Sequence, residues 1–187
     1  MRITEVGGLA DRLISRLEAF EQAQDRGPLA RLRRGLSPTS RHEAWPVLGA
    51  ILGPMGIGNE VIATVAGCFA LHPKHDAGAG NFGATMRELV PVEKRRDPAE
   101  SHARFRRLLA GGSSVEICAL VPHAVRLAKS KDAAVNYRQL LVDLWYWGER
   151  SKLEWARQYW DVRDETGSGL LKLALATSGG DEAEDGP

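Results

Sequence analysis

Apolar residues recur every three or four positions along most of the chain, which is the spacing of one face of an α-helix. In the first half, Gly-Pro pairs and single glycines separate successive apolar stretches. The pattern predicts helices over residues 9–20, 28–34, 45–52, 59–69 and 82–89. Between the last two, residues 72–81 (HPKHDAGAGN) are polar and rich in glycine, and we expect a loop there.

Capping signals mark the helix starts in the second half. The pairs are Asp97 with Pro98, Ser113 with Glu116, and Asn136 with Gln139. The first predicted helix runs to Leu109 and stops at a glycine pair. The stretch after Asn136 is long enough for two helices that meet near Gly148, or for one helix kinked there.

No segment of any length alternates apolar and polar residues with the period of two that a strand requires. The predicted fold is therefore all-α, in two small helical bundles that form one elongated unit. We expect the N-terminal lobe at residues 1–92, the C-terminal lobe at 93–178 and a disordered acidic tail at 179–187. The apolar island LLKLALA, residues 170–176, is interpreted as either a last short helix or a docking segment.

The composition agrees with a globular protein, with 43% apolar and 26% charged residues. No apolar run reaches the roughly 18 residues that a membrane helix needs, and the first residues lack the apolar core of a signal peptide. We expect a cytoplasmic protein without a membrane partner. Cys68 and Cys118 lie in apolar surroundings, which favours two reduced thiols in the core.

The formal net charge of +1 conceals an uneven distribution. Residues 1–25 carry three basic and five acidic groups, and residues 181–187 carry four acids. The body between them, residues 26–180, holds 22 basic and 15 acidic groups, a net charge of +7. A basic body with acidic ends hints at a polyanionic partner, although composition alone favours a solvated surface of mixed charge.

Two glycine- and histidine-containing patterns in the 72–83 region suggest chemistry only weakly. GAGNFG (Gly78, Gly80, Gly83) matches the dinucleotide fingerprint, but no strand delivers it to a helix, so a loop is the better interpretation. His72, His75 and Asp76 are too few and too close together for a well-formed metal site. We therefore expect no cofactor, no metal, no catalytic residues and no enzymatic activity.

Tryptophans can stack on nucleic-acid bases, and LWYWGER at residues 144–150 holds two of them. Residues two apart do not share a helix face, so one of Trp145 and Trp147 should point inward beside Leu140 and Leu144. A role in the core and in a subunit contact is the better interpretation, because a tryptophan buries a large apolar area.

Arginines gather in several places without an equal number of acids nearby, a pattern that is typical of phosphate-backbone binding without base reading. Arg104 and Arg107 are spaced to share one helix face. Arg26 and Arg41, at the edges of the first cluster, are interpreted as solvated. The candidate nucleic-acid-binding residues are Arg31, Arg33, Arg34, Arg104, Arg106, Arg107, Arg126, Lys129, Lys131, Arg138 and Arg150.

The order and spacing of three segments, LARLRRG, RFRRLL and LWYWGERSK, resemble the CasB family, the small subunit of the type I-E CRISPR Cascade complex. The resemblance covers roughly residues 13–161. By position, it carries the family's basic residues over to Arg34, Arg104, Arg107 and Arg150. Glu149 departs from the pattern, because some family members have a basic residue there.

The resemblance implies an all-helical, non-catalytic subunit of a ribonucleoprotein that acts in antiviral defence. Its implied partners are other Cascade subunits, a second copy of itself, single-stranded and R-loop DNA, and CRISPR RNA. Backbone contacts suit R-loop stabilisation, because the exchange of a DNA duplex for a guide–target hybrid is nearly balanced. The alternative is a helical scaffold whose arginines meet acidic protein partners.

Overall fold

The computed structural model describes residues 2–95 and 102–161, and within these ranges the protein is helical, with a single isolated β-bridge between His75 and Val135. The fold is therefore all-α, as predicted. The α-helices are α1 (Ile3–Gln22), α2 (Arg26–Arg34), α3 (Trp45–Leu52), α4 (Glu60–Leu71), α5 (Phe82–Glu88), α6 (Ala103–Leu109), α7 (Ser114–Ser130), α8 (Tyr137–Trp145) and α9 (Glu149–Trp160). Short 3-10 helices lie at Pro38–Ala44, Gly53–Gly56 and Val92–Lys94.

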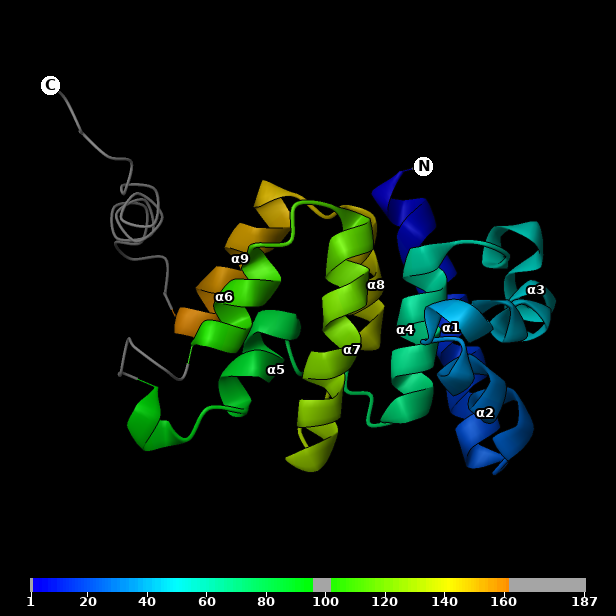
Figure 1. Cartoon of the computed structure of the whole chain (residues 1–187), viewed down its shortest axis with the longest axis horizontal. Coiled ribbons are helices and arrows are strands. Elements are labelled where there is room, and N and C mark those ends of the chain that lie inside the picture. The colour runs from blue at the N-terminus through cyan, green and yellow to red at the C-terminus, as the bar shows by residue number, and fades with distance from the viewer. Residues whose placement is uncertain (1, 96–101, 162–187) are drawn as a thin grey trace, which may run out of the picture.

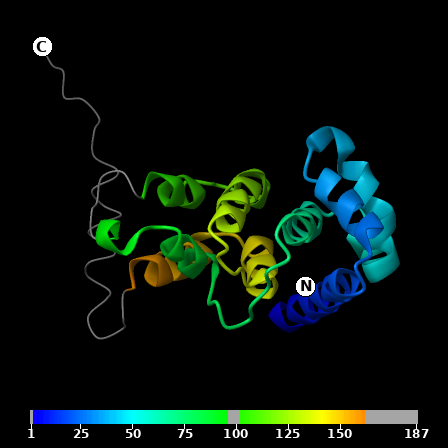
Figure 2. The same ribbon diagram turned by 90° about the horizontal axis from the view of Figure 1, so that it is seen from below.

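The helices form an elongated row, with α2 and α3 at one end and α5, α6 and α9 at the other (Figure 1). Helices α4, α7 and α8 lie between these ends, and α1 lies against α4 and α8. In the view from below, α6 and α7 lie side by side along one face of the row, and α8 and α9 lie along the opposite face (Figure 2). This placement sets α2 and α6, the two arginine-rich helices, far apart.

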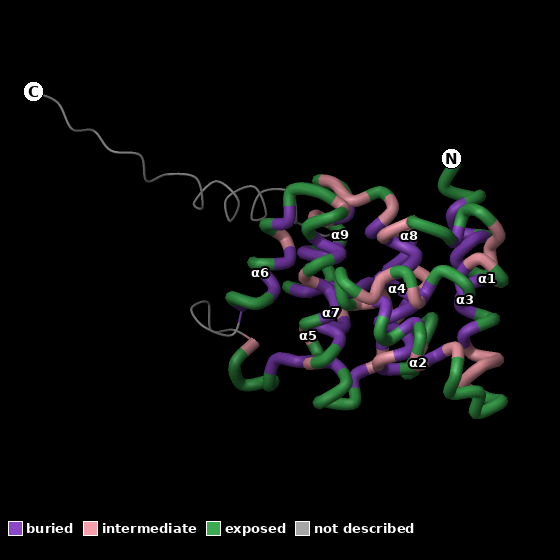
Figure 3. The backbone as a smooth tube through the Cα atoms, turned by 45° about the vertical axis from the view of Figure 1, so that its right-hand side comes forward, coloured by how far each residue is buried: buried purple, intermediate pink, exposed green. Residues whose placement is uncertain are grey.

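Helix α4 is the centre of the fold. Every residue from Val61 to Ala70 is buried, and the helix packs against α2, α7 and α8. A helix that is apolar on all sides belongs in a core. The exposed residues gather on the outer turns and connections of the other helices (Figure 3).

The predicted N-caps that lie in the described residues, Ser113 and Asn136, are confirmed, and Asn59 is a further N-cap. The side chains of Asn59, Ser113 and Asn136 accept hydrogen bonds from the backbone amides three residues on, at 3.1, 3.2 and 3.0 Å. The helices over residues 45–52 and 82–89 also form within one residue of the predicted ends. The predicted cap at Asp97 and Pro98, the apolar island at 170–176 and the tail at 179–187 lie outside the described residues.

The stretch after Asn136 forms two helices that meet near Gly148, one of the two predicted arrangements. Helix α8 ends at Trp145, so Trp147 lies in the connection and is not constrained by helical spacing. Trp147 donates a hydrogen bond from Nε1 to the Gly111 carbonyl at 2.8 Å and meets Trp155 edge-on at 4.9 Å between ring centroids. Trp145 and Trp147 are both partly buried and pack against the core, which confirms the core interpretation for two tryptophans where one was expected to point inward, while the subunit contact stays a prediction.

The loop at residues 72–81 is joined by hydrogen bonds to the segment that precedes α8. The His72 ring contacts the Ala133 carbonyl at 2.7 Å through Nε2, and the His75 ring contacts the Val135 carbonyl at 3.1 Å through Nδ1. The Tyr137 hydroxyl donates back to the His72 carbonyl at 2.6 Å. The histidines are thus part of the packing between the loop and α8.

Gly83, the last glycine of GAGNFG, is required by close helix packing. A Cβ added there would lie 2.0 Å from the Trp155 carbonyl oxygen of α9. Asn81 caps α5 by accepting from the Gly83 amide at 2.9 Å, and its amide nitrogen donates to the Glu154 carbonyl at 2.8 Å. The motif therefore joins α5 to α9.

The predicted division into two lobes stays a prediction. Helix α1 packs on α8, and α4 packs on both α7 and α8, so contacts cross the proposed boundary at residue 92. The buried apolar side chains belong to a core cluster that draws on both sides of this boundary.

Candidate nucleic-acid interface

Two of the four arginines of α2, and Arg41 of the 3-10 helix that follows, are engaged within the protein. Arg33 donates from Nε and Nη2 to the Ala70 carbonyl at 3.1 and 2.8 Å. Ala70 lies in the last turn of α4, where carbonyls have no partner within the helix. The helix dipole also stabilises a cation at this end. Arg34 pairs with Glu43 at 2.5 Å, and Arg41 pairs with Glu60 at 3.0 Å.

Two further members of the predicted set also have partners. Arg138 pairs with Asp11 of α1 at 2.5 Å, and this contact raises the pKa of the guanidinium. Arg106 has an interaction within the protein. Its positive charge opposes the burial that raises the pKa of the Tyr159 hydroxyl to about 12.

Arg104, Arg107 and Arg126, in contrast, converge on one hollow of about 600 Å³ between α6 and α7, here called the α6–α7 hollow. None of the described residues that line it is acidic, and none of the three arginines has an ion pair or hydrogen bond within the described part of the chain. The remaining lining residues are Met86, Leu108, Leu120, His123, Ala124, Leu127 and Ser130.

Phe105 explains why the α6 arginines face outward. Its ring is completely buried and stacks on Tyr159 of α9 at 3.8 Å with an interplanar angle of 11°. His102, just before the helix, contacts the Tyr159 hydroxyl at 2.5 Å through Nδ1. Because α6 packs on α9 through Phe105, Arg104 and Arg107 extend from an exposed face of α6 and line the hollow.

Helix α7 contributes both the floor of the hollow and one of its cations. Leu120, Ala124 and Leu127 recur at helical spacing on one face, and the two leucines remain half-buried. His123 and Arg126 are exposed beside them. Neither His123 nor Ser130 is among the candidate residues that the sequence predicts. The spacing of His123 among the apolar positions was the available signal.

Four other predicted residues are exposed and have no ion pair within the described residues. Lys129 and Lys131 lie at the C-terminal end of α7, next to Ser130 of the hollow. Arg31 is on α2 and Arg150 is in the first turn of α9, and neither lines the hollow. The structure therefore unites the candidate residues of α6 and α7 and separates them from those of α2.

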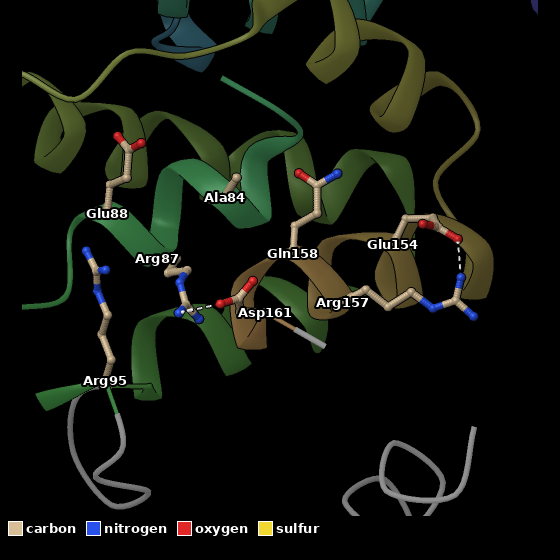
Figure 4. Close-up of a pocket in the computed structure, with 8 residues that line it drawn as sticks. All are labelled: Ala84, Arg87, Glu88, Arg95, Glu154, Arg157, Gln158 and Asp161. Carbon is tan, nitrogen blue, oxygen red and sulfur yellow. Dashed lines mark hydrogen bonds and ion pairs between the residues drawn. The ribbon is translucent and has the colours of Figure 1, made fainter. Parts of the chain in front are cut away.

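A second hollow, of about 550 Å³ between α5 and α9, is balanced in charge (Figure 4). Its three arginines, Arg87, Arg95 and Arg157, are matched by Glu88, Glu154 and Asp161. Arg87 pairs with Asp161 at 3.2 Å and Arg157 pairs with Glu154 at 2.9 Å. Because these acids already neutralise the arginines, this hollow is a poorer phosphate site than the α6–α7 hollow.

The buried nucleophilic groups are not activated. Cys68 and Cys118 are both free and buried, as expected for core thiols. Burial raises the pKa of the Cys118 thiol to about 11 and also raises the pKa of the Cys68 thiol. A reactive thiol needs the opposite shift, toward the thiolate.

Comparison with known proteins identifies relatives of this arrangement. The family model described as CRISPR-associated protein Cse2 matches residues 28–160. A crystal structure of CasB from Thermus thermophilus superposes with a TM-score of 0.63 and 23% identity, over 81% of this chain and 97% of that one. At this identity the superposition shows a shared fold. The search of curated proteins found no match. No helix in the described residues is long and apolar enough to cross a membrane.

Proposed function

This chain belongs to the CRISPR-associated Cse2 family, the family of the small subunit of type I-E Cascade, and from that premise we propose that it binds nucleic-acid backbones through the α6–α7 hollow. The binding is independent of sequence and stabilises the R-loop, the opened DNA with its target and displaced strands. The other subunits of Cascade and a second copy of this chain are its proposed protein partners, and the chain itself performs no catalysis.

The observation that carries the proposal is the group of three unpaired arginines around the hollow. Arg104, Arg107 and Arg126 present guanidinium groups to solvent, and no acid among the described lining residues competes for them. Guanidinium forks match phosphate oxygens, and each neutralised phosphate releases counterions. Lys129 and Lys131 extend the positive surface along the end of α7.

The chemistry of this surface suits a subunit that must accept any DNA sequence. Contacts to phosphate fix the position of a strand without reading its bases. The exchange of duplex DNA for a guide–target hybrid is nearly balanced, so a few backbone contacts are enough to favour the open state. Arg31 and Arg150 are proposed as outlying contacts, while Arg33, Arg34, Arg106 and Arg138 would have to exchange a partner within the protein.

The test is the salt dependence of binding by the purified protein to single-stranded DNA and RNA of two unrelated sequences. We expect R104A/R107A to weaken binding to all four ligands and to lower the log–log salt slope by about 1.4, the value for two phosphate contacts on a single strand. The matched control is R12A/R26A, which removes two exposed arginines of α1 and α2 with the same change in net charge. Equal loss in both variants, or no loss in either, would contradict the assignment to the hollow.

A second function is supported by the apolar floor of the same hollow. Leu120 and Leu127 are half-buried, and a charged phosphate backbone makes no favourable contact with apolar side chains of this kind. A scaffold protein that receives an acidic, amphipathic protein segment would use the leucines and the arginines together. Absence of any mobility shift with DNA or RNA at low salt would favour this alternative.

A further inference from the structure

The α6–α7 hollow combines two chemistries that a bare phosphate site does not need together. Its rim is cationic, through Arg104, Arg107 and Arg126. Its floor is apolar, with half-buried Leu120 and Leu127 above the buried Met86 and Leu108. Apolar surface is favourably covered by other apolar groups, so the best occupant carries both leucine-like side chains and negative charge.

The chain itself contains such a sequence after its last described residue, Asp161. The island LLKLALA at residues 170–176 supplies four leucines. Four acids then follow within residues 181–185, in the segment DEAED. Apolar residues followed closely by clustered acids are the composition that an apolar floor with an arginine rim would select.

The described end of the chain lies beside the helix that carries two of the rim arginines. Phe105 of α6 stacks on Tyr159 and meets the ring of Trp160 edge-on at 5.3 Å between centroids. Arg104 directly precedes Phe105 in the chain, and Arg107 follows two residues later. The eight residues between Asp161 and the island can span up to about 28 Å when extended.

We propose that residues 170–185 of this chain dock in the α6–α7 hollow, with the leucines on its floor and the acids on its arginine rim. The docked segment covers the same arginines that are proposed to bind phosphates, and it therefore competes with nucleic acid. Because the segment is tethered, its effective concentration at the hollow is in the millimolar range, and weak contacts are sufficient. The docking stands on the hollow and the tail alone, whereas the competition rests on the proposed function.

Electrostatics favours this hollow over the one between α5 and α9, which is also near the end of α9. There, Arg87 and Arg157 already have carboxylate partners, Arg95 donates to the Val90 carbonyl, and Glu88 balances its charge (Figure 4). An acidic segment would gain little from that neutral site. Only the α6–α7 hollow, of the two, offers arginines that lack partners in the described part of the chain.

The docking can be tested in the full chain by paramagnetic broadening. An Ala183→Cys variant places one exposed thiol among the tail acids, and Cys68 and Cys118 are buried and should not take up a nitroxide label. We expect the label to broaden the methyl signals of Leu120 and Leu127 and to leave those of Leu9 and Leu13 in α1 unchanged. Adding D181N/E182Q/E184Q to this variant, or raising the salt to 1 M, should remove the broadening, because screening is then nearly complete.

The competition is tested with unlabelled protein and single-stranded DNA. We expect D181N/E182Q/E184Q to bind about five- to tenfold more tightly than the parent, the low end of the coupling between two linked sites. The control E18Q/E21Q/D25N makes the same charge change at the other acidic end of the chain and should gain clearly less. Equal gains would show a general charge effect and would overturn the competition.

Two outcomes separate the docking from the proposed function. Broadening of Leu120 and Leu127 without DNA binding by any variant would support the docking and overturn nucleic-acid binding by the hollow. DNA binding through Arg104 and Arg107 without any broadening would overturn the docking and leave the proposed function intact. Broadening of Leu120 and Leu127 in copies that carry no spin label, when these are mixed with spin-labelled copies, would contradict docking within one chain.

Discussion

Two segments of this protein have nearly the same sequence and different surroundings. Residues 31–34 read Arg-Leu-Arg-Arg in α2, and residues 104–107 read Arg-Phe-Arg-Arg in α6. In both, the second residue is completely buried and anchors the helix, Leu32 in one case and Phe105 in the other. The difference lies in what the flanking arginines meet.

In α2, two of the three arginines at residues 31–34 have partners within the protein. Arg33 donates to the Ala70 carbonyl of α4 and Arg34 pairs with Glu43, so within this segment only Arg31 has no ion pair or hydrogen bond to a described residue. In α6, Arg106 is engaged, and Arg104 and Arg107 face a hollow without acids. The same residue type therefore stabilises the fold in one segment and is available to a ligand in the other.

The largest expected effect concerns the two anchors. We expect Phe105→Ala to lower the free energy of unfolding by about 3–5 kcal/mol and Leu32→Ala by about 2–5 kcal/mol, because each leaves a cavity in the core. Among molecules that stay folded, Phe105→Ala should also weaken DNA binding, because α6 loses its stacking on Tyr159. Urea denaturation and fluorescence anisotropy measure the two effects. Equal DNA binding by both variants would show that α6 does not carry the site.

The next effect separates a structural arginine from an exposed one. Arg33→Ala should cost about 1.5–3 kcal/mol of stability, because it removes charged hydrogen bonds from the end of α4. Arg104→Ala should change stability by no more than about 0.5 kcal/mol, as expected for an exposed residue without a partner. Chemical denaturation of the two variants under the same conditions is the measurement. A similar cost for both would contradict the contrast between the segments.

A smaller effect is expected for single exposed arginines in DNA binding. Arg126→Ala should lower the log–log salt slope by about one, because one phosphate contact is lost. Arg31→Ala removes the same charge at the other end of the helix row and should have a smaller effect (Figure 1). Titrations between about 50 and 200 mM salt resolve the slopes. A larger effect of Arg31→Ala would move the main contact to α2.

The smallest effect is expected at the ion pair of Arg34 with Glu43. Its side chains are 58% and 33% exposed, so the pair is worth about 0.2–1 kcal/mol at low salt. Arg34→Ala should therefore be nearly neutral, and its small cost should disappear in 1 M salt. Thermal denaturation at the two salt concentrations checks this. A cost that persists in high salt would indicate that Arg34 contributes packing as well as charge.

Much of the fold could be predicted because its determinants are local. The asparagine and serine caps act within three residues, glycine and proline end helices wherever they occur, and the apolar spacing identifies each helix. The break near Gly148 was predicted for the same reason. The position of Trp147 was not, because its contact with Gly111 joins residues 36 apart in the chain.

The candidate site was predicted only as a set of charges. The sequence alone determined the all-helical class, most of the helix boundaries, the basic body and the resemblance to a Cascade subunit, although α1 begins at Ile3, ahead of the predicted residue 9. Only the tertiary structure decided that Arg33 and Arg138 have partners from α4 and α1, and that Arg104, Arg107 and Arg126 meet around an apolar floor. The physical reason is range: a helix cap depends on neighbours in the chain, whereas the availability of an arginine depends on whichever carboxylate or carbonyl the packing of distant helices brings within about 3 Å.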